Sequence, residues 1–345
     1  MDRTDRDGIN KKVVNALSGC VGEGIYIFEE VREMLKLGFI GAGTVGSALA
    51  IKLSEKGYPI TAVHSRTLAS AEKLAQSLKG CRVCTCSQEV ADAAELIFIT
   101  TPDAAIPVVV SEINWHPGQC VVHCSGADSA ETLSPARKFG AHIGAFHPLQ
   151  TFASVKQAID NIAGSTFAIE ADEPLKSILK ELTIALNGTH IELKASDKVV
   201  YHAAAVIVCN YLVTLVKLAD DLWQTFGVPR DQATKALLPL LKGTLNNIES
   251  VGIPQALTGP IARGDVGTVK KHIEALKREA PDVLSTYCEL GLQAIHVSLA
   301  KGKIDENKAV ELRSTLKAGL KKKISTEQPE KTTIGNTRND VLPVL

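Results

Sequence analysis

The sequence has no excess of charge of either sign, because 38 lysine and arginine residues balance 38 aspartate and glutamate residues. The pI is near 7.1, so no overall positive field attracts nucleic acid or an anionic membrane surface. The one strongly basic triplet, Lys321–Lys323, is expected to solvate the end of a helix. A small-molecule substrate is therefore the expected partner.

Long apolar runs are also absent. No stretch reaches the roughly 18 uninterrupted apolar residues of a membrane-spanning helix. The apolar segment after Lys12 is shorter than the core of about seven residues expected of a signal sequence. Residues 1–33 are therefore interpreted as a poorly anchored extension or a mis-set start, since Met34 stands directly before the first predicted strand. We expect a cytoplasmic protein that binds no membrane.

The eight cysteines are scattered through a chain of 345 residues, which is long enough for two packed domains without disulfides. This usage is typical of a reducing cytosol. Cys81, Cys84 and Cys86 are closely spaced, but no second pair and no nearby histidine pair completes a tetrahedral zinc site. We interpret them as small core residues and expect no metal.

One glycine-rich segment organises the first half of the chain. Within Leu35–Ser47, LKLGFIGAGTVGS, a short apolar run is followed by three glycines and then by apolar residues at helical spacing. The order strand, turn, helix is that of a dinucleotide-binding unit, in which the glycines permit a tight turn, close approach of a pyrophosphate and close packing of helix on strand. The pyrophosphate would bind the free N–H groups of the helix start. The predicted cofactor-binding residues of this turn are Gly41, Ala42, Gly43, Thr44, Val45 and Gly46.

The end of the second predicted strand, Pro59–His64, indicates which cofactor is bound. An NAD site has an aspartate or glutamate about twenty residues after the turn, which binds the ribose 2′-hydroxyl. This chain has Ser65, Arg66 and Thr67 there instead. A guanidinium and two hydroxyls can bind a 2′-phosphate, which favours NADP (NADPH) over NAD. The alternative is that Arg66 is a solvated residue at the start of a helix.

Strands and helices alternate from residue 35 to residue 150, a pattern that predicts a parallel sheet with right-handed crossovers. After residue 195 the sequence is nearly all helical, and from residue 325 it has no periodicity. The sequence therefore predicts an α/β fold, a Rossmann-type doubly wound parallel sheet followed by an all-helical C-terminal domain. The predicted segments are an extension (1–33), a Rossmann NAD(P)-binding domain (34–194), a helical domain (195–324) and a disordered tail (325–345).

The ends of later strands supply further candidates, because open α/β folds bind ligands at the carboxyl ends of their strands. Thr101 and Pro102 follow the fourth predicted strand and are expected to face the cofactor. Ser125 follows the fifth and is expected near the nicotinamide. His147 directly follows the sixth, Ala141–Phe146, in a loop fixed by Pro148, and is a candidate proton donor, although a lone histidine is more often structural.

The long helix predicted over Lys198–Phe226 is apolar around its circumference, as expected for a helix buried centrally in a bundle. Lys198, His202 and Asn210 follow one another along one stripe of this helix. His202 is a second candidate proton donor, and a buried Asn210 would need a partner, which makes it a candidate to orient a substrate. The alternative for Asn210 is a hydrogen bond between helices.

Six segments of the chain together resemble a known family. They are GFIGAGTVGSALA, ITTPDAAI, VVHCSGADSAETL, GAFHPLQTF, YHAAAVIVCNYL and LTGPIARGD. The resemblance covers the chain from about residue 35 to about residue 320. On these segments the chain resembles the Rossmann-like family whose C-terminal half is a helical domain of unknown function. More distantly, its domain order is similar to that of pyrroline-5-carboxylate reductase, ketopantoate reductase and the β-hydroxyacid dehydrogenases. The resemblance implies NADP-linked hydride transfer to a small imine or keto acid, in a cleft between the domains, and a homodimer formed through the helical half.

The resemblance does not extend to every residue. β-Hydroxyacid dehydrogenases carry a lysine followed four residues later by asparagine, whereas Lys198 is followed at that spacing by His202, so the role of the lysine is not carried over. Two hypotheses follow. In the first, the chain is a reductase whose candidate catalytic residues are His147, His202 and Asn210, with a histidine giving the proton. In the second, it is a non-enzymatic NADP-binding module that senses redox state or scaffolds a partner.

Overall fold

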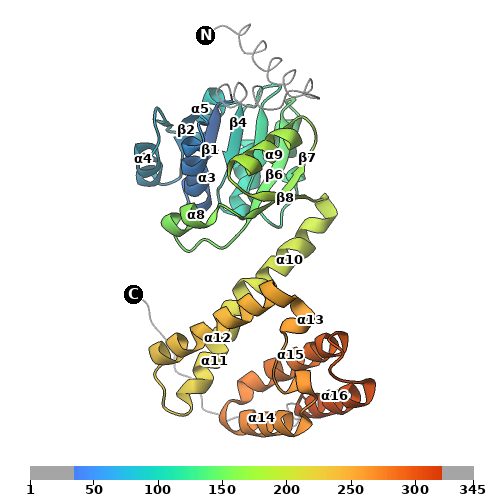
Figure 1. Cartoon of the computed structure of the whole chain (residues 1–345). Helices are drawn as coiled ribbons and strands as arrows, with labels where there is room; N and C mark the ends of the chain where they lie inside the picture. The colour runs from blue at the N-terminus through green and yellow to red at the C-terminus, as the bar shows by residue number, and fades with distance from the viewer. Residues whose placement is uncertain (1–34, 321–345) are drawn as a thin grey trace, which may run out of the picture. The chain divides into compact units, whose positions relative to one another are not determined.

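The computed structural model describes residues 35–320, and the chain divides into two compact units between Tyr211 and Leu212. The predicted extension and tail and the Lys321–Lys323 triplet lie outside the described residues. The first unit is an α/β unit (Figure 1). Its strands are β1 (Leu37–Ile40), β2 (Ile60–His64), β3 (Arg82–Val83), β4 (Leu96–Ile99), β5 (Cys120–His123), β6 (His142–Leu149), β7 (Thr166–Ala171) and β8 (Thr189–Glu192). Its α-helices are α3 (Thr44–Glu55), α4 (Leu68–Gln76), α5 (Ser87–Ala93), α6 (Ile106–Ser111), α7 (Ser134–Arg137), α8 (Val155–Asn161), α9 (Leu175–Ala185) and α10 (Lys198–Val208).

The eight strands form one sheet in the order β3-β2-β1-β4-β5-β6-β7-β8. All neighbouring strands are parallel except β6 and β7, which are antiparallel. The strand order reverses between β1 and β4, and open α/β sheets bind ligands at the carboxyl ends of the strands at such a point. The predicted Rossmann-type fold is confirmed, with the difference that the sheet is mixed because β7 returns beside β6.

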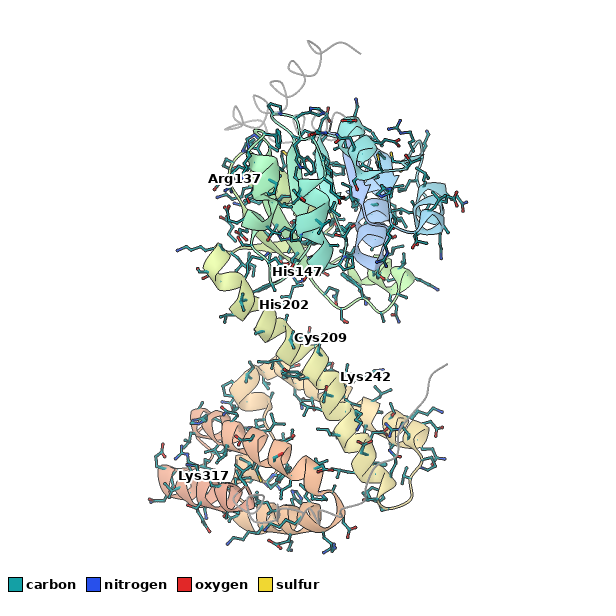
Figure 2. All side chains as sticks on the ribbon, turned by 180° about the vertical axis from the view of Figure 1, so that it is seen from behind. Arg137, His147, His202, Cys209, Lys242 and Lys317 are labelled. Carbon is teal, nitrogen blue, oxygen red and sulfur yellow. The ribbon has the colours of Figure 1, made fainter. Side chains whose placement is uncertain are left out.

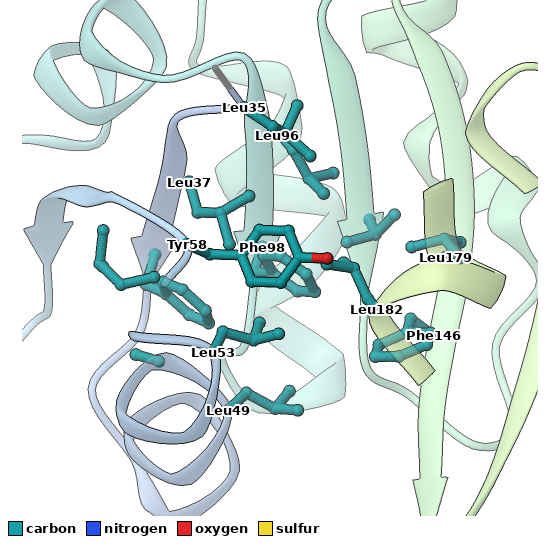
Figure 3. Close-up of a cluster of buried hydrophobic side chains, with 14 of the residues drawn as sticks. Leu35, Leu37, Leu49, Leu53, Tyr58, Leu96, Phe98, Phe146, Leu179 and Leu182 are labelled. Carbon is teal, nitrogen blue, oxygen red and sulfur yellow. The ribbon is translucent and has the colours of Figure 1, made fainter. Parts of the chain in front are cut away.

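The strands are apolar because helices cover both faces of the sheet. On one face, α3, α4 and α9 pack against a core in which the rings of Phe39 and Phe98 stack with centroids 4.8 Å apart. On the other face, α5, α6 and α7 pack against a second core that includes Ile97. Figure 3 shows Tyr58 among the leucines of the first core, where its hydroxyl donates to Glu181 Oε1 at 2.9 Å. These two cores hold the strand ends in fixed positions.

His147 lies within β6 rather than after it. The sequence predicts a strand that ends at Phe146 and a loop fixed by Pro148, but β6 continues to Leu149 and pairs with β7 over this stretch. Its parallel partner β5 pairs only as far as Ala145. A proline is tolerated there because the strand has lost its neighbour on one side and needs no further N–H donor on that side. His147 therefore stands just beyond the carboxyl end of β5.

The second unit is helical. Its helices are α11 (Asn210–Gln224, whose first residues belong to the first unit), α12 (Arg230–Val251), α13 (Ile253–Ala256), α14 (Val266–Glu279), α15 (Pro281–Ala300) and α16 (Glu306–Leu320). A separate core lies among α14, α15 and α16 and includes Ile273, Ile295 and Leu312. The sequence places the domain boundary at residue 195, where the helical pattern begins. The first compact unit continues to Tyr211 because residues of α10 contact the strand ends of that unit.

The long helix predicted over Lys198–Phe226 consists of two helices, α10 and α11, separated at Cys209. The prediction that it is buried in a bundle is wrong for the described chain, because Lys198 is the only buried residue of α10 and Asp220 the only one of α11. The segment Ala195–Gln224 reaches a mean hydropathy of 2.0. Its length and composition would allow it to cross a membrane, but buried helices of water-soluble proteins meet the same two criteria. Several of its large apolar residues, among them Val200, Ile207, Val208 and Val213, are more than half exposed within residues 35–320.

Candidate active site

The glycine turn has the geometry that the sequence predicts. Gly41 has a φ of +114°, which other residues rarely adopt, and its N–H donates to the carbonyl of His64 at 2.7 Å. A Cβ on Gly46 would collide with the Thr100 hydroxyl and with the carbonyl of Gly41. A Cβ on Gly43 would meet nothing within 4 Å. The fold itself therefore requires two of the glycines, whereas Gly43 borders open space.

The residues around this space fit the pyrophosphate of a dinucleotide. Gly43 is the N-cap of α3, no side chain caps the helix, and the first-turn N–H groups are free to bind an anion. Thr101 lies beside Gly41, and its hydroxyl is buried without a hydrogen-bond partner among the described residues. A ligand atom at this place would satisfy that hydroxyl. The cofactor contacts of the turn, of Thr101 and of the exposed Pro102 stay predictions.

The end of β2 carries the residues predicted to select NADP. Thr67 is the N-cap of α4, but its side chain makes no cap hydrogen bond. Arg66 is exposed, and its side chain makes no ion pair within residues 35–320. Ser65, beside it, is half-buried. A guanidinium and a hydroxyl in this state can bind a phosphate without first giving up a protein partner.

Two histidines far apart in the sequence lie together in the first unit. Figure 2 labels both, His147 on β6 and His202 on α10. Their rings have centroids 6.0 Å apart and are nearly perpendicular. A Cβ built on Gly126, just after β5, would lie 2.6 Å from His202 Nδ1 and 2.9 Å from His147 Nε2. His202 Nδ1 is buried and has no partner in the described part of the chain. The two nitrogens therefore converge over the backbone at the carboxyl end of β5.

Two further residues of α10 complete this cluster: Tyr201, which no sequence motif singled out, and Lys198, which shares the predicted stripe of His202 but was given no role. The hydroxyl oxygen of Tyr201 lies 2.7 Å from His147 Nδ1. Lys198 is 1% exposed, and its Nζ donates to the backbone carbonyl of Ser125 at 3.1 Å. Helical spacing was the available signal, because Tyr201 and His202 follow Lys198 by three and four residues, which places each of them beside Lys198 on the helix surface.

Ser125 is bonded to the protein rather than open to a cofactor. Its hydroxyl oxygen lies 2.9 Å from Asp103 Oδ2 and 3.1 Å from Asp128 Oδ2, and it accepts a hydrogen bond from the N–H of Asp128. The residue is 3% exposed. The hydroxyl proton is therefore engaged with a carboxylate, and the contact of Ser125 with the nicotinamide stays a prediction.

Burial sets the protonation states of the cluster. It lowers the pKa of His147 to about 4, an effect that the nearby Lys198 and His202 reinforce. It raises the pKa of Tyr201 to about 12. Burial also lowers the pKa of Lys198, although the carboxylate of Glu170 opposes this shift. Near neutral pH the imidazole of His147 is therefore neutral and the hydroxyl of Tyr201 keeps its proton.

Asn210 does not join the cluster. It begins α11 and is exposed, so the prediction of a buried Asn210 is wrong. Its side chain follows the same stripe as Lys198 and His202, but it lies about 12 Å further along the helix axis than His202. Residues on one helix face point in the same direction, but they do not have to contact the same neighbouring element. Beyond His202 the helix leaves the strand ends of the first unit.

The cysteines form no metal site in the described part of the chain. No group of three or more histidine, cysteine, aspartate or glutamate side chains within residues 35–320 is arranged to hold a metal ion. The cysteines of this range are free thiols. Burial raises the pKa of Cys81 to about 11, which disfavours the thiolate that a metal needs.

Comparison with protein families gives two matches, one after the other along the chain, and the second begins within the first compact unit. Residues 28–148 match a family described as a Rossmann-like domain. Residues 165–294 match a family described as a domain of unknown function, DUF2520. The chain therefore carries a Rossmann-like domain followed by a DUF2520 domain, which confirms the resemblance drawn from the sequence motifs.

Similar proteins and structures include several oxidoreductases. 2-(Hydroxymethyl)glutarate dehydrogenase from Eubacterium barkeri is 34% identical over 113 residues, which span 31% of this chain and only 36% of that protein. A proposed NADP oxidoreductase from Bacteroides fragilis is 27% identical with a TM-score of 0.61, covering 76% of this chain and 98% of that one. A protein from Thermotoga maritima is 26% identical with a TM-score of 0.65, covering 77% and 99%. Pyrroline carboxylate reductase from Plasmodium falciparum, solved with NADP bound, shares the fold at 15% identity and a TM-score of 0.53, covering 80% and 99%.

Proposed function

We propose that this chain, an NAD(P)-dependent oxidoreductase built from a Rossmann-like and a DUF2520 domain, uses NADP to transfer hydride to or from a small keto acid or imine. One observation carries the proposal. The open glycine turn and the converging imidazoles of His147 and His202 lie at the carboxyl ends of strands of one sheet, where such folds bind dinucleotides and substrates. The dehydrogenase from Eubacterium barkeri and the NADP oxidoreductase from Bacteroides fragilis support the same class of reaction.

The nicotinamide, when bound, supplies the hydride. In our proposal the residues of the chain bind and orient the reactants. The neutral imidazole of His147 donates a hydrogen bond to the substrate oxygen or nitrogen, since its pKa near 4 makes it a poor store for a proton at neutral pH. That leaves the transferred proton to His202, whose Nδ1 is buried and unpartnered in the described chain.

Turnover of NADPH tests the proposal. The full chain is mixed with NADPH and a panel of small keto acids and imines, and the loss of NADPH fluorescence is followed. We expect at least one compound to be reduced with consumption of the cofactor. Binding of NADPH without turnover of any compound would identify a sensor or scaffold instead, and would overturn the proposed enzyme.

Arg66→Ala should change the cofactor preference. A hydrogen bond to a charged group contributes roughly 1.5–3 kcal/mol, so the loss of one such bond should weaken NADPH binding by about 10- to 100-fold and leave NADH binding nearly unchanged. Calorimetry with both cofactors measures this. Arg137→Ala is the matched control, because Arg137 is paired with Glu131 away from the end of β2. An equal loss for NADPH and NADH would show that Arg66 does not read the 2′-phosphate.

The exposed apolar residues of α10, α11 and α12 support a homodimer as part of the proposal. Large apolar side chains on these helices are more than half exposed, among them Val200, Ile207, Val208, Val213, Leu240 and Val251. A membrane would suit the segment from α10 to α11 by composition, but α12 does not meet the same test. A bilayer would therefore leave the apolar residues of α12 in water, whereas a second copy can cover the apolar residues of α11 and α12 in the helical unit. A stable dimer buries about 1,200–2,000 Å² of surface.

Val213→Asp should produce a monomer. By light scattering the parent should have twice the monomer mass of 36.8 kDa. Val213 is 69% exposed on α11, so an aspartate there would be desolvated in the interface and the variant should have the monomer mass. Val310→Asp, on an exposed position of α16, is the control that should stay dimeric. If the parent is monomeric by itself and floats with phosphatidylcholine vesicles, the segment Ala195–Gln224 binds a membrane and the proposed dimer is wrong.

A further inference from the structure

A hydrogen bond joins Tyr201 to His147. The hydroxyl oxygen and Nδ1 are 2.7 Å apart, and the rings meet edge to face at 88° with centroids 5.6 Å apart. Tyr201 comes from α10 and His147 from β6, so the bond connects elements that are distant in the sequence. Within residues 35–320 it is the one hydrogen bond that either side chain makes.

The chemistry of the two groups gives this bond a direction. A neutral imidazole has one N–H donor and one acceptor nitrogen, and a tyrosine hydroxyl has one proton to donate. For Tyr201 the acceptor in the described chain is His147 Nδ1. The opposite direction would leave the tyrosine proton without an acceptor there, which costs free energy in a half-buried position. Donation from Tyr201 puts the imidazole proton on Nε2.

Nε2 is the nitrogen that faces the converging point of the cluster. The position of a Cβ on Gly126 lies 2.9 Å from His147 Nε2 and 2.6 Å from His202 Nδ1. Both nitrogens therefore approach one region at the end of β5 from different elements. A proton on Nε2 of His147 makes this nitrogen a donor toward that region.

We propose that Tyr201 is a positioning residue, which donates to Nδ1 and so fixes His147 in the tautomer whose Nε2–H binds the substrate oxygen or nitrogen. The inference rests on the proposed function, but the tautomer is a property of the protein without substrate. A phenol suits this task better than a carboxylate. A carboxylate would accept from Nδ1 and favour a charged imidazole, whereas a phenol donor keeps the ring neutral with Nε2 protonated.

Nitrogen-15 NMR of the full chain with labelled histidine tests the tautomer directly, because the two ring nitrogens of a neutral imidazole have different shifts in each tautomer. We expect His147 to carry its proton on Nε2 near neutral pH, with Nδ1 shifted as a hydrogen-bond acceptor. The His147→Gln variant assigns the signal by removing it. Tyr201→Phe should move the Nδ1 signal toward that of a free acceptor nitrogen and admit the second tautomer. A proton on Nδ1 in the parent, or an unchanged His147 signal in Tyr201→Phe, would overturn the inference.

The chain contains a matched control pair. His272 Nδ1 and the hydroxyl oxygen of Tyr287 are 2.9 Å apart in the second unit, with a similar edge-to-face arrangement of the rings. Tyr287→Phe therefore removes the same atom from the same kind of bond, and it should leave the signal of His147 and the kinetics unchanged.

Kinetics supply a second readout once a substrate is found. Tyr201→Phe should lower kcat by about 10- to 100-fold, by analogy with the loss of a partner that orients a metal-bound histidine, with the Kd for NADPH unchanged. A kcat equal to that of Tyr287→Phe would overturn the positioning role. The experiments distinguish failure of the proposed function from failure of the positioning role of Tyr201. If no compound is reduced while Tyr201→Phe still changes the tautomer, the proposed function fails and the pairing stands.

Discussion

The double variant His147→Gln, His202→Gln should turn over its substrate about 10²–10⁴-fold more slowly than the parent, with the affinity for NADPH little changed. Glutamine keeps a hydrogen-bonding group of similar reach, but it cannot carry a proton at neutral pH. The two imidazole nitrogens converge over Gly126, so removing both takes away the hydrogen-bond donor and the proton donor of the proposed reaction together. Steady-state rates and calorimetry with NADPH measure the two quantities separately.

His190→Gln is the control for this variant, because His190 is exposed on β8 and its replacement should leave the rate unchanged. Rates for the double variant within a few-fold of the parent would remove both histidines from the mechanism. The pH dependence adds a check on His147 alone. Its pKa is lowered to about 4, so its charge does not change between about pH 6 and pH 8. Any pH dependence in that range should therefore persist in the single variant His147→Gln.

Gly43→Val should abolish binding of the dinucleotide while both units stay folded. The backbone of Gly43 is extended, with φ of −78° and ψ of −169°, so a valine fits its conformation. A Cβ there meets no protein atom within 4 Å, which means that the added side chain would occupy the space in front of the α3 N-terminus. That is the space in which we place the pyrophosphate. Calorimetry with NADPH and circular dichroism test the two halves of the prediction.

Gly267→Val is the matched control, because Gly267 also lies at a helix N-terminus and a Cβ there makes only an ordinary contact with Asp265. It should bind NADPH like the parent. Gly46 is unsuitable for this test, since a Cβ on it would collide with Thr100 and disturb the packing of α3 on the sheet. NADPH binding by Gly43→Val at the affinity of the parent would contradict the assignment of this turn.

The sequence by itself was sufficient to predict the first unit and its glycine turn, because both depend on local chemistry. An apolar run that is buried on both faces, a turn that needs a positive φ at Gly41 and a helix that must approach closely at Gly46 are properties of a few neighbouring residues. The alternation of strands and helices then permits little besides a parallel sheet with right-handed crossovers. For the same reason the sequence alone identifies which residues follow the strands and are therefore candidates for the site.

The tertiary structure alone decided which of those residues meet. Helical spacing placed Lys198, His202 and Asn210 on one stripe, but only the first turns of α10 lie against the strand ends, so Asn210 is exposed. The pairing of β6 with β7 carries the strand through His147, and no local pattern around Pro148 specifies that partner. Only the tertiary structure shows that Tyr201 bonds to His147. Only the tertiary structure shows, too, that α10 and α11 are largely exposed in the described chain. Periodicity fixes the direction in which a side chain points, whereas its neighbour is set by packing between segments that are distant in the sequence.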